Sequence, residues 1–130
     1  MRVQITENFY LDEFTCKDQS DIPLNVFMNI LKLAVEMQKI RNYFQRSITV
    51  NSGYRSPSYN KKIGGASKSQ HLLGMACDFT VSGYTSFEVA DIIEDLMQSE
   101  FITNGGLGEY DTFTHYDIRT KPARWNNTTK

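Results

Sequence analysis

Apolar residues recur at three- and four-residue steps between Leu24 and Phe44, and this pattern constrains the fold more than any other feature of the chain. That spacing places them on one face of an α-helix. The preceding segment Ser20-Asp21-Ile22-Pro23 predicts a helix start, because proline is favoured in the first turn. We therefore expect a long helix over residues 24–44 that braces the core. Its buried stripe should comprise Phe27, Ile30, Leu31, Ala34, Met37, Ile40 and Phe44.

Shorter patterns after this helix predict strands. Residues 47–51 alternate between apolar and polar side chains, and Ser52-Gly53 follows as a turn signal. Residues 75–81 also indicate a strand, although its interior contains the carboxylate of Asp78. Between the two strands, residues 54–74 form a polar, glycine-containing loop with a short helix after Ser56-Pro57. Loops of this length usually serve a function.

The C-terminal third predicts a second helix and a β-hairpin. Thr85 and Glu88 form a capping box that opens the helix. Residues 105–110 and 113–119 suggest two strands joined by a turn, and residues 126–130 suggest a flexible polar tail. With 130 residues, the chain is expected to form one domain over 1–130. The fold class that we predict is α+β, with a small antiparallel sheet packed against helices.

Composition argues against several classes of function. The 14 Lys and Arg residues balance 15 Asp and Glu residues, for a formal net charge of -1, so nucleic-acid binding is not expected. No apolar stretch is long enough to span a membrane, and no signal peptide is readable at the N-terminus, so no location is assigned. A monomer is the default expectation. Cys16 and Cys77 are interpreted as reduced structural thiols, with a disulfide between them as the alternative.

The two histidines of the chain, His71 and His115, lie in structured segments close to carboxylates. Catalytic zinc ions are typically held by three protein ligands drawn from His and carboxylate side chains. His71, Asp78 and His115 would supply such a set. A carboxylate inside an apolar strand is costly unless it is paired or bound to metal, which favours this hypothesis for Asp78. The alternative is that both histidines are ordinary hydrogen-bonded residues and that Asp78 caps a turn.

Asp117 should share a strand face with His115, because side chains alternate along a strand. It would then act as a general base for water, or as an acceptor that fixes an imidazole. A surface salt bridge from Asp117 to Arg119 or Arg124 is the structural alternative. In the turn before the long loop, Arg55 could clamp a substrate carboxylate through two parallel hydrogen bonds, although most loop arginines are simply exposed to solvent.

Four segments together resemble the peptidase M15 family. They are Ser52-Gly53-Tyr54-Arg55-Ser56, Ser69 to Asp78 with the pattern Ser-x-His-x6-Asp, Gly105-Gly106-Leu107-Gly108, and His115-Tyr116-Asp117. Residues 9–17 also look like the start of such domains, so the resemblance covers nearly the whole chain. Members of this family are zinc D,D-carboxypeptidases and L,D-type endopeptidases that cut peptidoglycan stem peptides, and they are often encoded by bacteriophages.

The resemblance implies a zinc domain of the hedgehog and D,D-peptidase type, with Zn²⁺ bound by His71, Asp78 and His115. It also implies that Arg55 holds a substrate carboxylate. Two further residues, Ser69 and Gln70, would contact substrate or order the loop. The implied partner is a peptidoglycan stem peptide.

The general base departs from the family pattern. Many relatives have an acid three residues before the last His ligand, where this chain has Thr112, and others have a His where it has Phe113. Asp117 is the first candidate for this role and Asp111 the second. Because of this departure, a catalytically weak or inactive zinc-containing module that binds cell wall, or a phage structural module, is the alternative to a peptidase.

Overall fold

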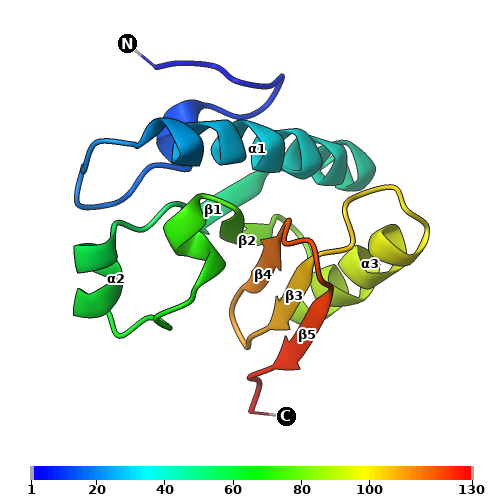
Figure 1. Ribbon diagram of the computed structural model, residues 1–130. Coiled ribbons are helices and arrows are strands. Elements are labelled where there is room, and N and C mark those ends of the chain that lie inside the picture. Colours follow the sequence, from blue (N-terminus) through cyan, green and yellow to red (C-terminus); the bar gives the residue numbers. More distant parts are fainter. Residues whose placement is uncertain (1, 130) are drawn as a thin grey trace.

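The computed structural model describes residues 2–129, and its longest element is the predicted helix, α1, at Leu24–Phe44. Figure 1 shows α1 lying across one side of the molecule, with the strands below it. The helix has the predicted bounds, but it is rotated slightly relative to the predicted stripe. Val26 and Leu33 are buried in place of Phe27 and Leu31, which are only partly buried. The remaining predicted stripe residues are buried, namely Ile30, Ala34, Met37, Ile40 and Phe44.

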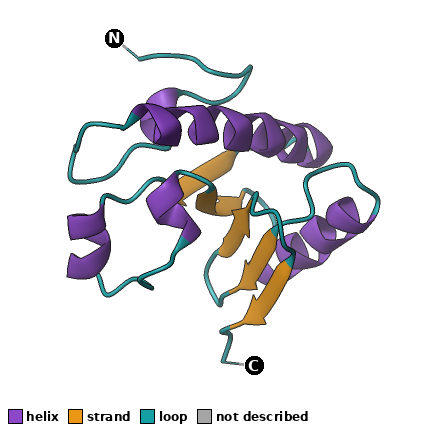
Figure 2. Ribbon diagram, in the orientation of Figure 1, coloured by secondary structure: helices purple, strands orange, loops and turns teal. Residues whose placement is uncertain are grey.

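Five strands form one sheet in the order β1-β2-β4-β3-β5, as the orange arrows of Figure 2 show. They are β1 Ile48–Ser52, β2 Ala76–Val81, β3 Gly106–Glu109, β4 Thr114–Asp117 and β5 Ala123–Asn126. All neighbours are antiparallel except β3 and β5, which are parallel. The predicted α+β class with a mostly antiparallel sheet is therefore confirmed.

The second long helix, α3 at Ser86–Gln98, begins at the predicted capping box. The Thr85 hydroxyl accepts a hydrogen bond from the Glu88 amide, and the Glu88 carboxylate accepts one from the Thr85 amide. The helix packs against β3, β2 and β4. Its buried residues join those of α1 and of the inward-facing positions of β2, such as Cys77 and Phe79, in one hydrophobic core.

The long loop between β1 and β2 contains two short helices. Helix α2, Pro57–Lys62, is capped by the Ser56 hydroxyl as predicted, and the 3-10 helix η2 spans Gln70–Leu73. Gly74 ends η2 in the left-handed region, with φ 73°, and leads the chain directly into β2. A further 3-10 helix, η1, spans Leu11–Glu13 near the N-terminus.

The C-terminal segment, for which the sequence predicts a flexible tail, begins with the last residue of β5. Strand β5 includes Asn126, and the Asn127 amide donates to the Glu109 carbonyl at 2.8 Å. Thr129 bonds to the Asp111 carboxylate, so the segment is tied to the hairpin up to that residue; Lys130 lies outside the described residues. The sequence patterns did not predict β5, because it is only four residues long and pairs with β3 rather than with β4, the strand that precedes it in the chain.

Both cysteines are free and buried, in agreement with the interpretation that they are structural thiols. The thiol of Cys16 contacts Ser56 at the start of α2, and burial raises the pKa of the Cys77 thiol. Within residues 2–129, no helix combines the length and the apolar character needed to cross a bilayer.

Candidate metal centre

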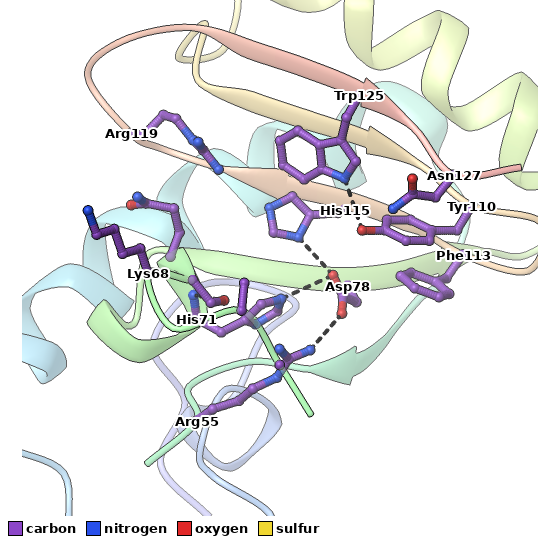
Figure 3. A pocket seen from close by; sticks show the side chains of 14 residues that line it. Arg55, Lys68, His71, Asp78, Tyr110, Phe113, His115, Arg119, Trp125 and Asn127 are labelled. Carbon is purple, nitrogen blue, oxygen red and sulfur yellow. Dashed lines mark hydrogen bonds and ion pairs between the residues drawn. The ribbon is translucent and has the colours of Figure 1, made fainter. Parts of the chain in front are cut away.

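The three predicted metal ligands converge at one point. The carboxylate Oδ1 of Asp78 lies 3.2 Å from Nε2 of His71 and 3.0 Å from Nδ1 of His115. One potential ligand atom from each residue lies within 4.8 Å of the others, and all three residues are buried. Figure 3 shows the imidazoles of His115 and His71 one above the other, each joined by a dashed line to the Asp78 carboxylate.

Three elements place these ligands. Asp78 in β2 and His115 in β4 are direct partners in the antiparallel register, so their side chains emerge side by side on the same face of the sheet. His71 reaches the same point from η2, whose first turn is ordered by the Ser69 hydroxyl accepting from the His71 amide at 3.1 Å. A strand pair and one capped turn thus bring together residues that are far apart in sequence.

The hydrogen bonds around the imidazoles select the nitrogens that face the site. Nδ1 of His71 lies 2.7 Å from the Gly53 carbonyl oxygen, which can only accept, so this nitrogen carries the proton. Nε2 of His115 lies 2.7 Å from Oδ2 of Asp117 and donates to it in the same way. Each ring thus directs its other nitrogen at the shared point, where this nitrogen donates a hydrogen bond to Asp78 when it is protonated and would bind a metal ion when it is not. This arrangement is typical of imidazole metal ligands, whose other nitrogen is usually held by a carbonyl or a carboxylate.

The electrostatics of the site favour an ionised Asp78. Burial opposes its ionisation, but hydrogen bonds with His115 and His71 outweigh this effect and hold the pKa of Asp78 well below its usual range. For His115, burial lowers the pKa, but hydrogen bonds to Asp117 and Asp78 have the opposite and larger effect, so the pKa is raised overall. A buried carboxylate flanked by two imidazoles therefore forms a site that could hold a cation. The donor set fits a catalytic zinc ion, with three protein ligands and space for a fourth.

Arg55 contacts the other oxygen of the Asp78 carboxylate. Its Nη2 atom lies 3.3 Å from Oδ2 of Asp78, and its Nε and Nη1 atoms donate to Ser52 and Asn60. The Arg55 side chain is only 14% exposed, which excludes the solvent-exposed alternative. The guanidinium is thus fixed beside the three candidate ligands.

Asp117 lies behind His115, away from the cleft. Its side chain is fully buried, and its two oxygens accept hydrogen bonds from the Gly106 amide, Nε and Nη2 of Arg119, and the His115 ring. Burial raises the pKa of Asp117, but the bonds from Arg119 and His115 dominate and lower it well below its usual value. Of the roles predicted for Asp117, this geometry favours that of an acceptor fixing an imidazole over that of a general base. The predicted partnership with Arg119 exists as well, but it is buried.

The second candidate base is also remote from the ligands. Asp111 is exposed, and its carboxylate accepts hydrogen bonds from Thr129. Neither Asp111 nor Asp117 lines the cleft, and among residues 2–129 the only carboxylate that does so is Asp78.

The three candidate ligands line a cleft of about 540 Å³ with two different walls. Arg55, Lys68, Ser69 and Gln70 contribute a polar wall, and Tyr110, Phe113 and Trp125 contribute an aromatic one. Figure 3 shows the aromatic side chains grouped on one side of the ligands. The Ser69 hydroxyl already accepts from His71, which matches the alternative that this residue orders the loop, whereas Gln70 lines the cleft.

Trp125 and Tyr110 were missed by the sequence reasoning. Trp125 lies in β5 opposite Gly108 of β3, and a Cβ atom at position 108 would collide with its indole. Gly106 is equally required, because a Cβ there would collide with the Asp117 carboxylate. The sequence therefore did contain a sign of these contacts, namely two glycines inside one strand. Such glycines mark positions where another group packs closely against the backbone.

Comparison with known proteins agrees with this geometry. The family model described as Peptidase M15 matches residues 7–117. A similar curated protein is the probable peptidoglycan L,D-endopeptidase MepK of Haemophilus influenzae, which is 35% identical over 82 residues. That match covers 59% of this chain and 41% of the relative, so the chain corresponds to less than half of that protein. Since the matched segment of the family model includes all three candidate ligands and most of the sheet, the chain belongs to the peptidase M15 family.

Proposed function

We propose that this protein is a zinc-dependent peptidase that hydrolyses peptide bonds in the stem peptides of bacterial peptidoglycan. The observation that carries the proposal is the convergence of His71, Asp78 and His115 in a cleft, with each imidazole oriented by a second partner. Membership of a peptidase family and similarity to a protein named as a probable peptidoglycan endopeptidase support the substrate class. The site of action would be the cell wall.

When bound at these ligands, zinc would polarise a peptide carbonyl and make water a competent nucleophile near neutral pH. The protein residues would hold this ion and orient the imidazoles that bind it. Asp117 keeps the proton of His115 on Nε2, and the Gly53 carbonyl keeps that of His71 on Nδ1. Both rings therefore retain their metal-facing lone pairs.

Arg55 is proposed to bind a carboxylate of the substrate. Nε, Nη1 and Nη2 each use one hydrogen on Ser52, Asn60 and Asp78, and a guanidinium has five N–H groups in all. The remaining N–H groups border the cleft and match the planar geometry of a carboxylate. Gln70, which also lines the cleft, would contact the peptide backbone.

The experiment that tests this function is digestion of purified peptidoglycan fragments by zinc-loaded protein, followed by mass spectrometry. The mass of the products separates removal of a terminal D-Ala from cleavage inside a cross-link. EDTA and the His71→Ala variant should both abolish cleavage, and a His71→Ala protein that still cleaves would contradict the proposal. Zinc analysis after gentle purification should give a stoichiometric ion that this variant loses.

One observation favours a second candidate function. Among residues 2–129, Asp78 is the only carboxylate in the cleft, so no free acid adjoins the ligands to transfer a proton. A zinc-containing module that binds cell-wall peptides without turnover would have this composition. Zinc-loaded protein that binds peptidoglycan fragments and leaves their masses unchanged would establish this alternative.

A further inference from the structure

We infer that the hydroxyl group of Tyr110 donates a hydrogen bond to the substrate carbonyl oxygen, and that Trp125 holds this hydroxyl in position. The inference rests on the proposed function, because it concerns the same cleft. Tyr110 would be a catalytic residue and Trp125 a positioning residue. The aromatic wall would then take part in the chemistry, in addition to shaping the cleft.

Tyr110 directly follows β3 and lines the cleft together with the three ligands. Its backbone carbonyl accepts a hydrogen bond from the Ser86 hydroxyl at 2.7 Å, which ties the residue to the start of α3. Its ring stacks on Phe113, with the centroids 4.3 Å apart and the planes 12° from parallel. Figure 3 shows the hydroxyl end of the ring pointing inward, toward the space between Trp125 and Asp78.

The hydrogen bonds of this hydroxyl determine its role. Nε1 of Trp125 lies 2.9 Å from the Tyr110 oxygen, and an indole N–H can only donate. Tyr110 is therefore the acceptor in this bond, and its own proton must point elsewhere. Within residues 2–129, no atom accepts that proton. A donor held in a cleft without a partner is suited to bind an acceptor on a ligand.

Trp125 is itself held on three sides. Its ring centroid lies 4.9 Å from that of His115, and the Arg119 guanidinium lies 5.2 Å from the centre of its ring. Below it, Gly108 supplies the space that a side chain would fill. The indole N–H consequently has a fixed direction, and its hydrogen bond holds the Tyr110 hydroxyl oxygen in a fixed position. The same indole packs against His115, so Trp125 lies between the Tyr110 hydroxyl and a candidate metal ligand.

Hydrolysis of an amide requires stabilisation of negative charge on the carbonyl oxygen. Water adds to the carbonyl carbon and gives up a proton, and the π electrons of the C=O bond move to oxygen. The C=O bond then re-forms as the C–N bond breaks, and the leaving amine takes up the proton that the water released. A fixed donor aimed at that oxygen lowers the barrier because its hydrogen bond strengthens as charge develops. The Tyr110 proton remains on the tyrosine throughout.

The test uses the zinc-loaded 130-residue protein and its Tyr110→Phe variant, which retains the ring on Phe113 and loses only the hydroxyl. Tyr84→Phe is the matched control, because Tyr84 is 37% exposed and packs on Phe44 outside the cleft. We expect kcat on a peptidoglycan fragment to fall about 100-fold in Tyr110→Phe, with KM and zinc content unchanged. Trp125→Phe should lower kcat in the same direction, since it removes the N–H that orients the hydroxyl.

Binding provides a readout that does not depend on turnover. A phosphinate analogue of the peptide bond, which places an anionic oxygen where the charge develops, should bind Tyr110→Phe about 100-fold more weakly than wild type, whereas the uncleaved peptide should bind equally. Equal phosphinate affinity in Tyr110→Phe and Tyr84→Phe would overturn the inference. If wild-type protein fails to cleave peptidoglycan, the proposed function fails, and the phosphinate comparison still decides whether Tyr110 is a donor.

Discussion

Nε2 of His115 lies 2.7 Å from Oδ2 of Asp117, on the opposite side of the ring from Asp78. The two residues are separated by a single position in β4, so strand alternation places both on the same face of the sheet. The bond fixes the tautomer of His115 and turns its Nδ1 toward the other ligands. Asp117 is in turn held by Arg119 and by the Gly106 amide. The proposed metal centre thus depends on a carboxylate that does not itself line the cleft.

The Asp117→Asn variant tests this dependence. An amide places an N–H against donors from His115, Arg119 or Gly106 in a fully buried position, so the His115 ring loses its fixed orientation. We expect zinc affinity to fall about 10–100-fold, and peptidase activity to fall with it. Because Asp117 is buried and paired with Arg119, the free energy of unfolding should also decrease, by about 3 kcal/mol. Competition with a zinc chelator and urea unfolding measure the two effects.

Asp111→Asn is the matched control, because Asp111 is exposed and its carboxylate accepts hydrogen bonds from Thr129 in the C-terminal segment. Its zinc affinity and activity should remain close to those of wild type. The reverse order, with Asp111→Asn the more damaging change, would assign the general base to the turn before β4 and contradict the positioning role of Asp117.

Zinc should stabilise the folded protein. An ion that binds only the native state adds about 2.7 kcal/mol when its concentration is 100 times the dissociation constant. The melting temperature should therefore rise with added zinc and fall with EDTA in wild type, and it should respond much less in His71→Ala. Calorimetry with and without EDTA measures the difference. A wild-type melting temperature that does not respond to zinc would contradict the assignment of these three residues as ligands.

Gly108→Ala should disturb the aromatic wall without straining the backbone. Its Cβ would collide with the Trp125 indole, which must then move away from His115 and Tyr110. Overpacking of this kind costs about 1–3 kcal/mol of stability. We also expect the tryptophan fluorescence to change, which is informative because Trp125 is the sole tryptophan. Combining Gly108→Ala with Trp125→Phe should restore part of the lost stability, and no restoration would argue against the collision as the cause.

Glu36 should contribute to the loss of stability in acid. It is buried in α1, where burial raises its pKa, but Lys39 and the amide and hydroxyl of Thr103 outweigh burial and bring the pKa below its ordinary value of 4.5. A lowered folded-state pKa means that the stabilisation is present above pH 4.5 and is lost as the pH falls through the folded-state pKa. Urea unfolding near neutral pH and at about pH 3 should show a smaller acid loss in Glu36→Gln than in wild type. Glu7→Gln, at an exposed position, serves as the control and should lose as much as wild type.

Local patterns were sufficient to predict most elements. The spacing of apolar residues predicted α1, the capping box predicted the start of α3, and a carboxylate inside an apolar strand singled out Asp78. Each of these signals lies within a few residues of the chain. Strand alternation likewise predicted that Asp117 and His115 share a face, because that relationship depends only on the backbone of β4.

The tertiary structure alone decided which side chains and strands come into contact. The role of Asp117 depends on Arg119 and Gly106, the buried face of α1 depends on the sheet below it, and β5 exists only because β3 offers it a parallel edge. Trp125 and Tyr110 consequently escaped prediction, although their residues were visible in the sequence. Their contacts join segments that are distant in the chain, and the free energy of such contacts appears only once packing brings the segments together.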